Sequence, residues 1–164
     1  MNGCVKPTGP DSSPADKPDA LALDQQLCFH FYAASNLITR LYRPVLNELG
    51  LTYPQYLVML ALWEKAPRTV GALGEALYLD SGTLTPLLKR MEQAGLITRA
   101  RDPEDERRVQ VELTKKGRNL KADALTVPET LTEGFEGNPA EVENLRESVQ
   151  ALVATLARHG KERG

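Results

Sequence analysis

The residues in this sequence that are best suited to a chemical reaction are a cysteine and three tyrosines that follow it. Cys28 stands early in a helical pattern, and Tyr32, Tyr42 and Tyr53 follow it along the chain. The thiolate, and not the thiol, attacks a peroxide. A helix N-terminus favours that charged form, and phenol hydroxyls can donate hydrogen bonds to it. Tyr32 lies one helical turn beyond Cys28 on the same face, whereas spacing alone does not place the other two tyrosines. The pattern predicts a redox-sensing cysteine.

A second interpretation gives Cys28 no chemistry. Free cysteine is among the most frequently buried residue types and behaves as a small apolar group, so Cys28 could belong to the core. The sensing interpretation is favoured by other side chains that could line an apolar pocket for an organic oxidant. These are Phe29, Phe31, Tyr56, Met59 and Trp63.

A second group of residues, between Tyr78 and Gly117, is arranged for contact with DNA. A helical pattern is followed by a glycine stop at Gly95, a strand, a charged turn and a second strand, which is the order of a winged helix-turn-helix. A helix of this kind fits the major groove, where hydroxyl and basic side chains reach base edges. Lys89 and Arg90 are better suited to phosphates. The candidate DNA-binding residues are Ser81, Thr83, Thr85, Lys89, Arg90, Arg99, Arg101, Asp105 and Arg107.

The charged turn between the two strands, residues 102–108, carries four acids, which are unfavourable at a DNA surface. We expect Arg107 to project into the minor groove, where the potential is most negative. Asp105 would then hold another arginine in position. The alternative is a solvated hairpin that contacts nothing, and the order of the flanking elements argues against it.

The distribution of charge supports one DNA-facing surface. The formal net charge is −2, but residues 81–118 hold nine basic and six acidic side chains. The excess of three positive charges therefore lies where the wing and its helix are predicted. The expected partner is double-stranded DNA.

Composition excludes several other classes of protein. A hydrophobic content of 41% with 26% charged residues is typical of a globular domain. No apolar run reaches the roughly 18 residues of a membrane span, and no apolar segment at the N-terminus resembles a secretory signal. The two cysteines lack metal-site spacing, and His30 and His159 form no catalytic set. We expect a cytoplasmic protein that is not an enzyme, has no catalytic residues, and holds no metal or cofactor.

Periodicity predicts a mainly α fold with a small β wing. Residues 1–18, rich in proline, are expected to form a disordered tail. Residues 19–164 are expected to form a single domain, in which a helix beginning near Ala20 kinks or restarts at Pro44 and ends at Gly50. Further helices are predicted over 53–65, 69–77, 81–91, 114–126 and 138–160, and strands over 96–101 and 109–113.

The two ends of this domain carry wide apolar stripes. The winged helix-turn-helix covers about 69–117, which leaves helices in 19–50 and 118–160 to bury those stripes. DNA-reading proteins of this type commonly bind two half-sites as two-fold dimers. We expect a homodimer through these helices on a pseudo-palindromic operator; the alternative is that both stripes are ordinary core.

The segment from Leu51 to Gly117 resembles the multiple-antibiotic-resistance regulator (MarR) family of dimeric winged-helix repressors. The Leu96-Ile97 strand entry, the wing and the Leu113-Thr114-x-x-Gly117 close all fit that family. The block around Cys28, with Tyr42-Arg43-Pro44 and Leu51-Thr52-Tyr53-Pro54-Gln55-Tyr56, is similar to its organic-hydroperoxide-sensing (OhrR) branch. The likeness covers roughly residues 23 to 118.

That resemblance implies a function and roles for particular residues. It implies that Cys28 reacts with organic hydroperoxides, and that Tyr42 and Tyr53, from the same or the other subunit, are hydroxyl partners of its sulfur, with Tyr32 nearby. It also implies minor-groove insertion by Arg107 with support from Asp105. Oxidation would release the operator and derepress a peroxide-detoxification gene.

Two questions remain open from the sequence. Some members of the branch carry a second cysteine in the C-terminal half, but the only other cysteine here is Cys4. Oxidised Cys28 is therefore expected to react with an external low-molecular-weight thiol, or with Cys4 through the tail. The alternative function is a repressor released by a small molecule, such as a phenolic acid, with Cys28 inert.

Overall fold

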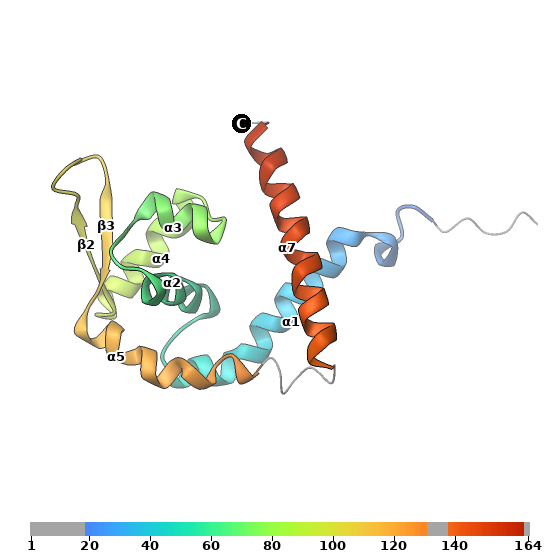
Figure 1. Ribbon diagram of the computed structural model, residues 1–164, viewed down its shortest axis with the longest axis horizontal. Coiled ribbons are helices and arrows are strands. Elements are labelled where there is room, and N and C mark those ends of the chain that lie inside the picture. Colours follow the sequence, from blue (N-terminus) through green and yellow to red (C-terminus); the bar gives the residue numbers. More distant parts are fainter. Residues whose placement is uncertain (1–18, 131–137, 163–164) are drawn as a thin grey trace, which may run out of the picture. The chain divides into compact units, whose positions relative to one another are not determined.

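The computed structural model describes residues 19–130 and 138–162, and its elements are shown in Figure 1. The predicted tail, residues 1–18 with Cys4, lies outside the described residues. The chain divides into two compact units, residues 1–37 and residues 38–164.

The described part of the first unit begins with a short 3-10 helix, η1 (Leu23–Gln25), and continues with the start of α1 (Leu27–Glu48). The prediction of one helix from near Ala20 was wrong, because Gln26 takes an extended conformation (φ −86°, ψ 107°). Its side-chain amide nitrogen donates to the carbonyl oxygen of Ala20 at 2.6 Å, which holds the chain in this turn. Cys28 therefore lies in the first turn of α1.

Helix α1 continues through Pro44 to Glu48 as one helix, so of the two expected alternatives, a kink or a restart, the restart does not occur. Its end at Gly50 is confirmed: the glycine has a φ of +67°, a left-handed conformation that side chains disfavour. The backbone nitrogen of Thr52 then donates to Gln55 Oε1 at 2.8 Å, where α2 (Tyr53–Glu64) begins.

The winged helix-turn-helix consists of α3 (Val70–Leu77), α4 (Ser81–Gln93) and an antiparallel sheet of order β1-β3-β2. Strands β2 (Ile97–Arg101) and β3 (Val109–Leu113) match the predicted hairpin, with Ile97 opposite Leu113 and Arg101 opposite Val109. Strand β1 (Arg68–Thr69) was not predicted, because two residues are too few to show an alternating pattern.

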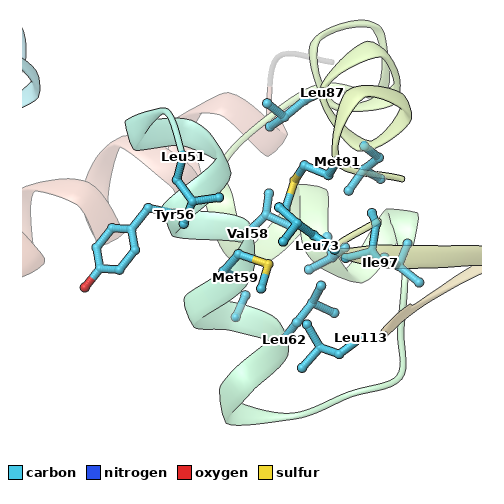
Figure 2. Close-up of a cluster of buried hydrophobic side chains, with 14 of the residues drawn as sticks. Leu51, Tyr56, Val58, Met59, Leu62, Leu73, Leu87, Met91, Ile97 and Leu113 are labelled. Atoms are coloured by element: carbon cyan, nitrogen blue, oxygen red, sulfur yellow. The ribbon is translucent and has the colours of Figure 1, made fainter. Parts of the chain in front are cut away.

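The core of the second unit lies between α2, α3, α4 and the sheet, as Figure 2 shows. The inward face of α4 consists of Leu84, Leu87, Leu88 and Met91, which are all buried. Burying these side chains against α2 and the sheet fixes the orientation of the opposite face of α4. The largest fully buried side chains are Leu46, Val58, Met59, Leu62, Leu73, Leu84, Leu88, Met91, Ile97, Val111 and Val127.

The C-terminal segments begin with α5 (Lys115–Asp123), which is followed by the 3-10 helix η2 (Ala124–Thr126). The hydroxyl of Thr114 caps α5 by accepting from the backbone nitrogen of Gly117 at 3.0 Å. Helix α7 (Pro139–Glu162) begins after Asn138, as predicted, and ends two residues beyond the expected stop at Gly160. No helix within the described residues is both long and apolar enough to cross a membrane.

Candidate redox site and nucleic-acid interface

In the first unit, Cys28 is a free and exposed cysteine rather than a packed core residue. Tyr32, one turn further along α1, is 69% exposed. The helical spacing predicted for this pair is therefore present, and both side chains are accessible to a reactant or to a partner chain. Neither side chain is buried in this chain.

In the second unit, three tyrosine rings from α1 and α2 form one aromatic cluster. The ring centroids of Tyr42 and Tyr53 lie 5.3 Å apart, and Tyr56 lies 6.4 Å from Tyr42 and 6.5 Å from Tyr53. The spacing of residues along the sequence did not bring Tyr42 and Tyr53 together; the turn at residues 49–52 does. Tyr56, expected only as part of an apolar wall, is a third phenol of this group, and Figure 2 shows its hydroxyl pointing away from the apolar core.

The cluster keeps its hydroxyls protonated. Burial raises the pKa of Tyr42, Tyr53 and Tyr56 above the ordinary tyrosine value, and mutual repulsion adds to the effect for Tyr42 and Tyr56. A phenol with a raised pKa is neutral near pH 7 and can donate a hydrogen bond. The cluster is therefore suited to stabilise a negatively charged sulfur or oxygen atom.

The outer face of α4 presents the predicted DNA-binding side chains. Residues 81, 83, 85, 89 and 90 are all exposed. The carboxylate of Asp80 caps the helix: it accepts from the backbone nitrogen of Thr83 at 2.9 Å and from the Thr83 hydroxyl at 2.8 Å. These bonds hold the pKa of Asp80 below its usual value. Asp80 thus stabilises the first turn of α4 within the chain itself.

The aspartates of the wing tip form ion pairs and hydrogen bonds within the turn, which explains their presence on a surface expected to contact DNA. Asp105 Oδ1 lies 3.1 Å from Arg107 Nε, and Asp105 Oδ2 lies 3.4 Å from Arg108 Nε. Asp102 is buried, and its carboxylate accepts from the backbone nitrogen of Glu104 at 3.0 Å. Arg107 remains 91% exposed in its side chain. The turn therefore presents a tethered but accessible guanidinium.

Arg99 and Arg101, both predicted to bind DNA, differ in their surroundings. Arg101 is exposed and donates weakly to the carbonyl oxygen of Glu106 at 3.5 Å. Arg99 forms an ion pair with Glu92 of α4 in which Nη2 lies 2.7 Å from Oε2. The partner of Arg99 was not foreseen from the sequence, and direct DNA contact by either arginine stays a prediction. Within the described residues, no cluster of three potential metal ligands occurs.

Comparison with known proteins places these features in a family context. Residues 40–124 match the family model described as "Transcriptional regulator SarA/Rot". The chain is 48% identical over 141 residues to the "Organic hydroperoxide resistance transcriptional regulator" of Bacillus subtilis (strain 168), covering 86% of this chain and 96% of that protein.

Two solved structures are also similar. One is reduced AbfR bound to DNA, with 37% identity and a TM-score of 0.71 over 83% of this chain and 93% of that one. The other is disulfide-formed AbfR, with 38% identity and a TM-score of 0.57 over 80% of this chain and 92% of that one. AbfR is a protein of Staphylococcus epidermidis.

Proposed function

We propose that this chain, which belongs to the MarR/SarA family of winged helix-turn-helix transcriptional regulators, is a DNA-binding repressor that senses organic hydroperoxides through Cys28. The observation that carries the proposal is an exposed thiol in the first turn of a helix, in the same chain as a complete winged helix. The similarity to a regulator of organic hydroperoxide resistance supports the choice of oxidant.

The proposed sensing step is a two-electron oxidation of Cys28. The thiolate sulfur attacks the outer oxygen of the hydroperoxide, the O–O bond breaks, and the alkoxide leaves and takes a proton as the alcohol. The sulfur is oxidised to a sulfenic acid. A low-molecular-weight thiol then attacks that sulfur, giving a mixed disulfide and one water molecule. A disulfide with Cys4 would form by the same reaction within the protein.

The phenol cluster supplies the hydrogen bonds in this proposal. Tyr42 and Tyr53, from the same or the partner subunit of a dimer, donate to the reactive sulfur in its thiolate form, and Tyr32 adds a hydroxyl from one turn beyond Cys28. Loss of the negative charge on oxidation weakens these bonds, and a bulky group on the sulfur displaces the helices around it. In a dimer, such a shift changes the spacing of the two α4 helices, which serve as the recognition helices, and DNA is released.

Replacing Tyr42 or Tyr53 with phenylalanine should slow the oxidation of Cys28 by roughly tenfold or more, because a hydrogen bond to a charged group contributes about 1.5–3 kcal/mol. The rate of thiol loss under excess cumene hydroperoxide measures this, with DNA affinity before oxidation as the control. Tyr78→Phe is a matched variant, since Tyr78 lies 67% exposed at the end of α3. Equal rates for all four proteins would remove the cluster from the site.

A homodimer through α1 and α7 completes the proposal. Both helices leave apolar side chains uncovered in the single chain, including Leu27 (65% exposed) on α1 and Leu156 (60%) on α7. A partner chain of the same kind would bury them, and two recognition helices would then meet two half-sites of a pseudo-palindromic operator.

Light scattering should give a solution mass of twice the 18.1 kDa of the chain. Leu145→Glu and Leu156→Glu should each raise the dimer dissociation constant by roughly a hundredfold, because a buried unpaired charge is costly. Leu125→Glu is the matched control, since this leucine is 69% exposed but lies in η2, outside both helices. A monomeric wild type, or equal effects for all three, would contradict the interface.

In contact with DNA, α4 enters the major groove and the wing enters the minor groove. Ser81, Thr83 and Thr85 face base edges, and Lys89 and Arg90 face phosphates. Arg101 adds a positive charge on β2, and Arg107, tethered by Asp105, reaches into the minor groove. The test of the whole proposal is fluorescence anisotropy on DNA from upstream of its own gene. Addition of cumene hydroperoxide should release the DNA, and binding that ignores the oxidant would favour a ligand-gated repressor.

A further inference from the structure

The ion pair between Glu92 and Arg99 joins the two parts of the molecule that must contact DNA together. Glu92 lies in the last turn of α4, and Arg99 lies in the middle of β2. Glu92 Oε1 accepts from the backbone nitrogen of Arg99 at 3.0 Å, and Oε2 accepts from its Nε at 3.0 Å and its Nη2 at 2.7 Å. One carboxylate thus holds both the strand and its side chain.

We propose that Glu92 and Arg99 form a clamp that positions the wing relative to the recognition helix, and that neither side chain contacts DNA. The clamp rests on the proposed DNA-binding function and gives Arg99 a different role from the DNA contact expected from the sequence.

The place of the clamp in the fold determines what it can control. The chain turns between α4 and β2 at Gly95, whose φ of +72° places the strand beside the helix it has just left. Arg99 is paired with Val111 in the β2–β3 ladder, and Val111 is fully buried. Fixing Arg99 therefore fixes the middle of the hairpin's first strand, and the tip at 102–108 extends beyond it (Figure 1).

The chemistry of the pair disfavours a direct contact with phosphate. Arg99 donates through three nitrogens to Glu92, and its side chain is only 25% exposed. The pair has no net charge, since Arg99 also holds the pKa of Glu92 below its usual value. A phosphate brought to Arg99 would meet the Glu92 carboxylate as well, and the pair would release no counterion.

Pre-organisation explains why such a clamp affects affinity. The recognition helix and the wing occupy neighbouring grooves, so both must be in place at the same time. A wing held at the right angle loses less conformational freedom on binding than a free one. The clamp therefore acts through the wing and not through a contact of its own.

The experiment measures anisotropy of the reduced protein on its upstream DNA over a range of salt concentrations. Glu92→Gln and Arg99→Gln should each weaken binding by roughly three- to tenfold, and the double variant should be no weaker than either. In all three variants, the dependence of DNA affinity on salt concentration should equal that of wild type. Arg99→Lys should behave like Arg99→Gln, since lysine keeps the charge but lacks the planar fork.

Two further variants separate positioning from folding and from general charge. In an Arg107→Ala background, Glu92→Gln should have no further effect, because the clamp acts through the wing tip. Glu64→Gln is the charge-matched control: Glu64 also pairs with an arginine, Arg68, but is 76% exposed and lies on α2. It should leave affinity unchanged.

Several results would overturn the clamp. One is unchanged DNA affinity in Glu92→Gln. Another is near-normal binding by Arg99→Lys together with a slope of log affinity against log salt that is smaller by about one per protomer in Arg99→Gln. A third is a loss of affinity from Glu92→Gln that adds to the loss from Arg107→Ala in the double variant. Weakening that tracks a fall in the free energy of unfolding would assign the pair to folding alone. If wild type binds none of the upstream DNA, the proposed function fails first, and the clamp with it.

Discussion

Replacing Cys28 with serine is expected to leave DNA binding intact and to abolish release by organic hydroperoxide. Serine is nearly isosteric with cysteine and keeps a hydrogen-bonding group, but its hydroxyl does not react with a hydroperoxide as a thiolate does. Because Cys28 is exposed, the change removes no core packing. Wild type should lose its DNA on oxidation, and the affinity of Cys28→Ser should stay within about twofold of its value before oxidation.

The measurement is anisotropy on upstream DNA for wild type, Cys28→Ser and Cys4→Ser, before and after cumene hydroperoxide and after added dithiothreitol. Cys4→Ser is the matched control, since it removes the other thiol of the chain. If an external thiol traps the sulfenic acid, Cys4→Ser should release and recover DNA like wild type. Release of DNA by oxidised Cys28→Ser would refute the sensor assignment.

The regular elements could be predicted because local signals specify them. Alternation over Val109–Leu113 matches β3 to the residue, and Asp80, Thr114 and Asn138 cap the helices that follow them. The start of α1 was missed because Gln26 forms side-chain bonds to Ala20 and Ala22, which compete with the helix and leave no periodic signal.

The candidate sites were predicted residue by residue but not as arrangements. Tyr42 and Tyr56 lie on different helices, so the turn between the helices decides whether their rings meet. Glu92 and Arg99 are seven residues apart across a helix–strand turn, and no periodicity of either element indicates that they pair. The apolar stripe of α4 predicts which face of the helix is buried and therefore which face is exposed. Contacts between different elements depend on their packing, which the pattern of a single sequence does not show.

Replacing Arg107 with alanine should weaken DNA binding by roughly ten- to a hundredfold per protomer while leaving the thiol chemistry unchanged. An arginine in the minor groove contributes about 1–3 kcal/mol to DNA binding. Its loss should reduce the slope of log affinity against log salt concentration by about one per protomer. The tether explains why the effect is large for so exposed a side chain: Asp105 accepts from both the backbone nitrogen and Nε of Arg107, at 3.2 and 3.1 Å, so the guanidinium is oriented before binding.

Salt-dependent anisotropy and the rate of Cys28 oxidation measure the two halves of this prediction on the same protein. Arg107→Lys should fall between wild type and alanine, since lysine retains the charge without the planar fork. Arg146→Ala is the matched control: it also removes one positive charge from an exposed ion pair, on α7, and should bind DNA like wild type. Equal losses in Arg107→Ala and Arg146→Ala would mean that the wing contributes only general charge. In that case the acids of the turn would shape a hairpin that does not enter the groove.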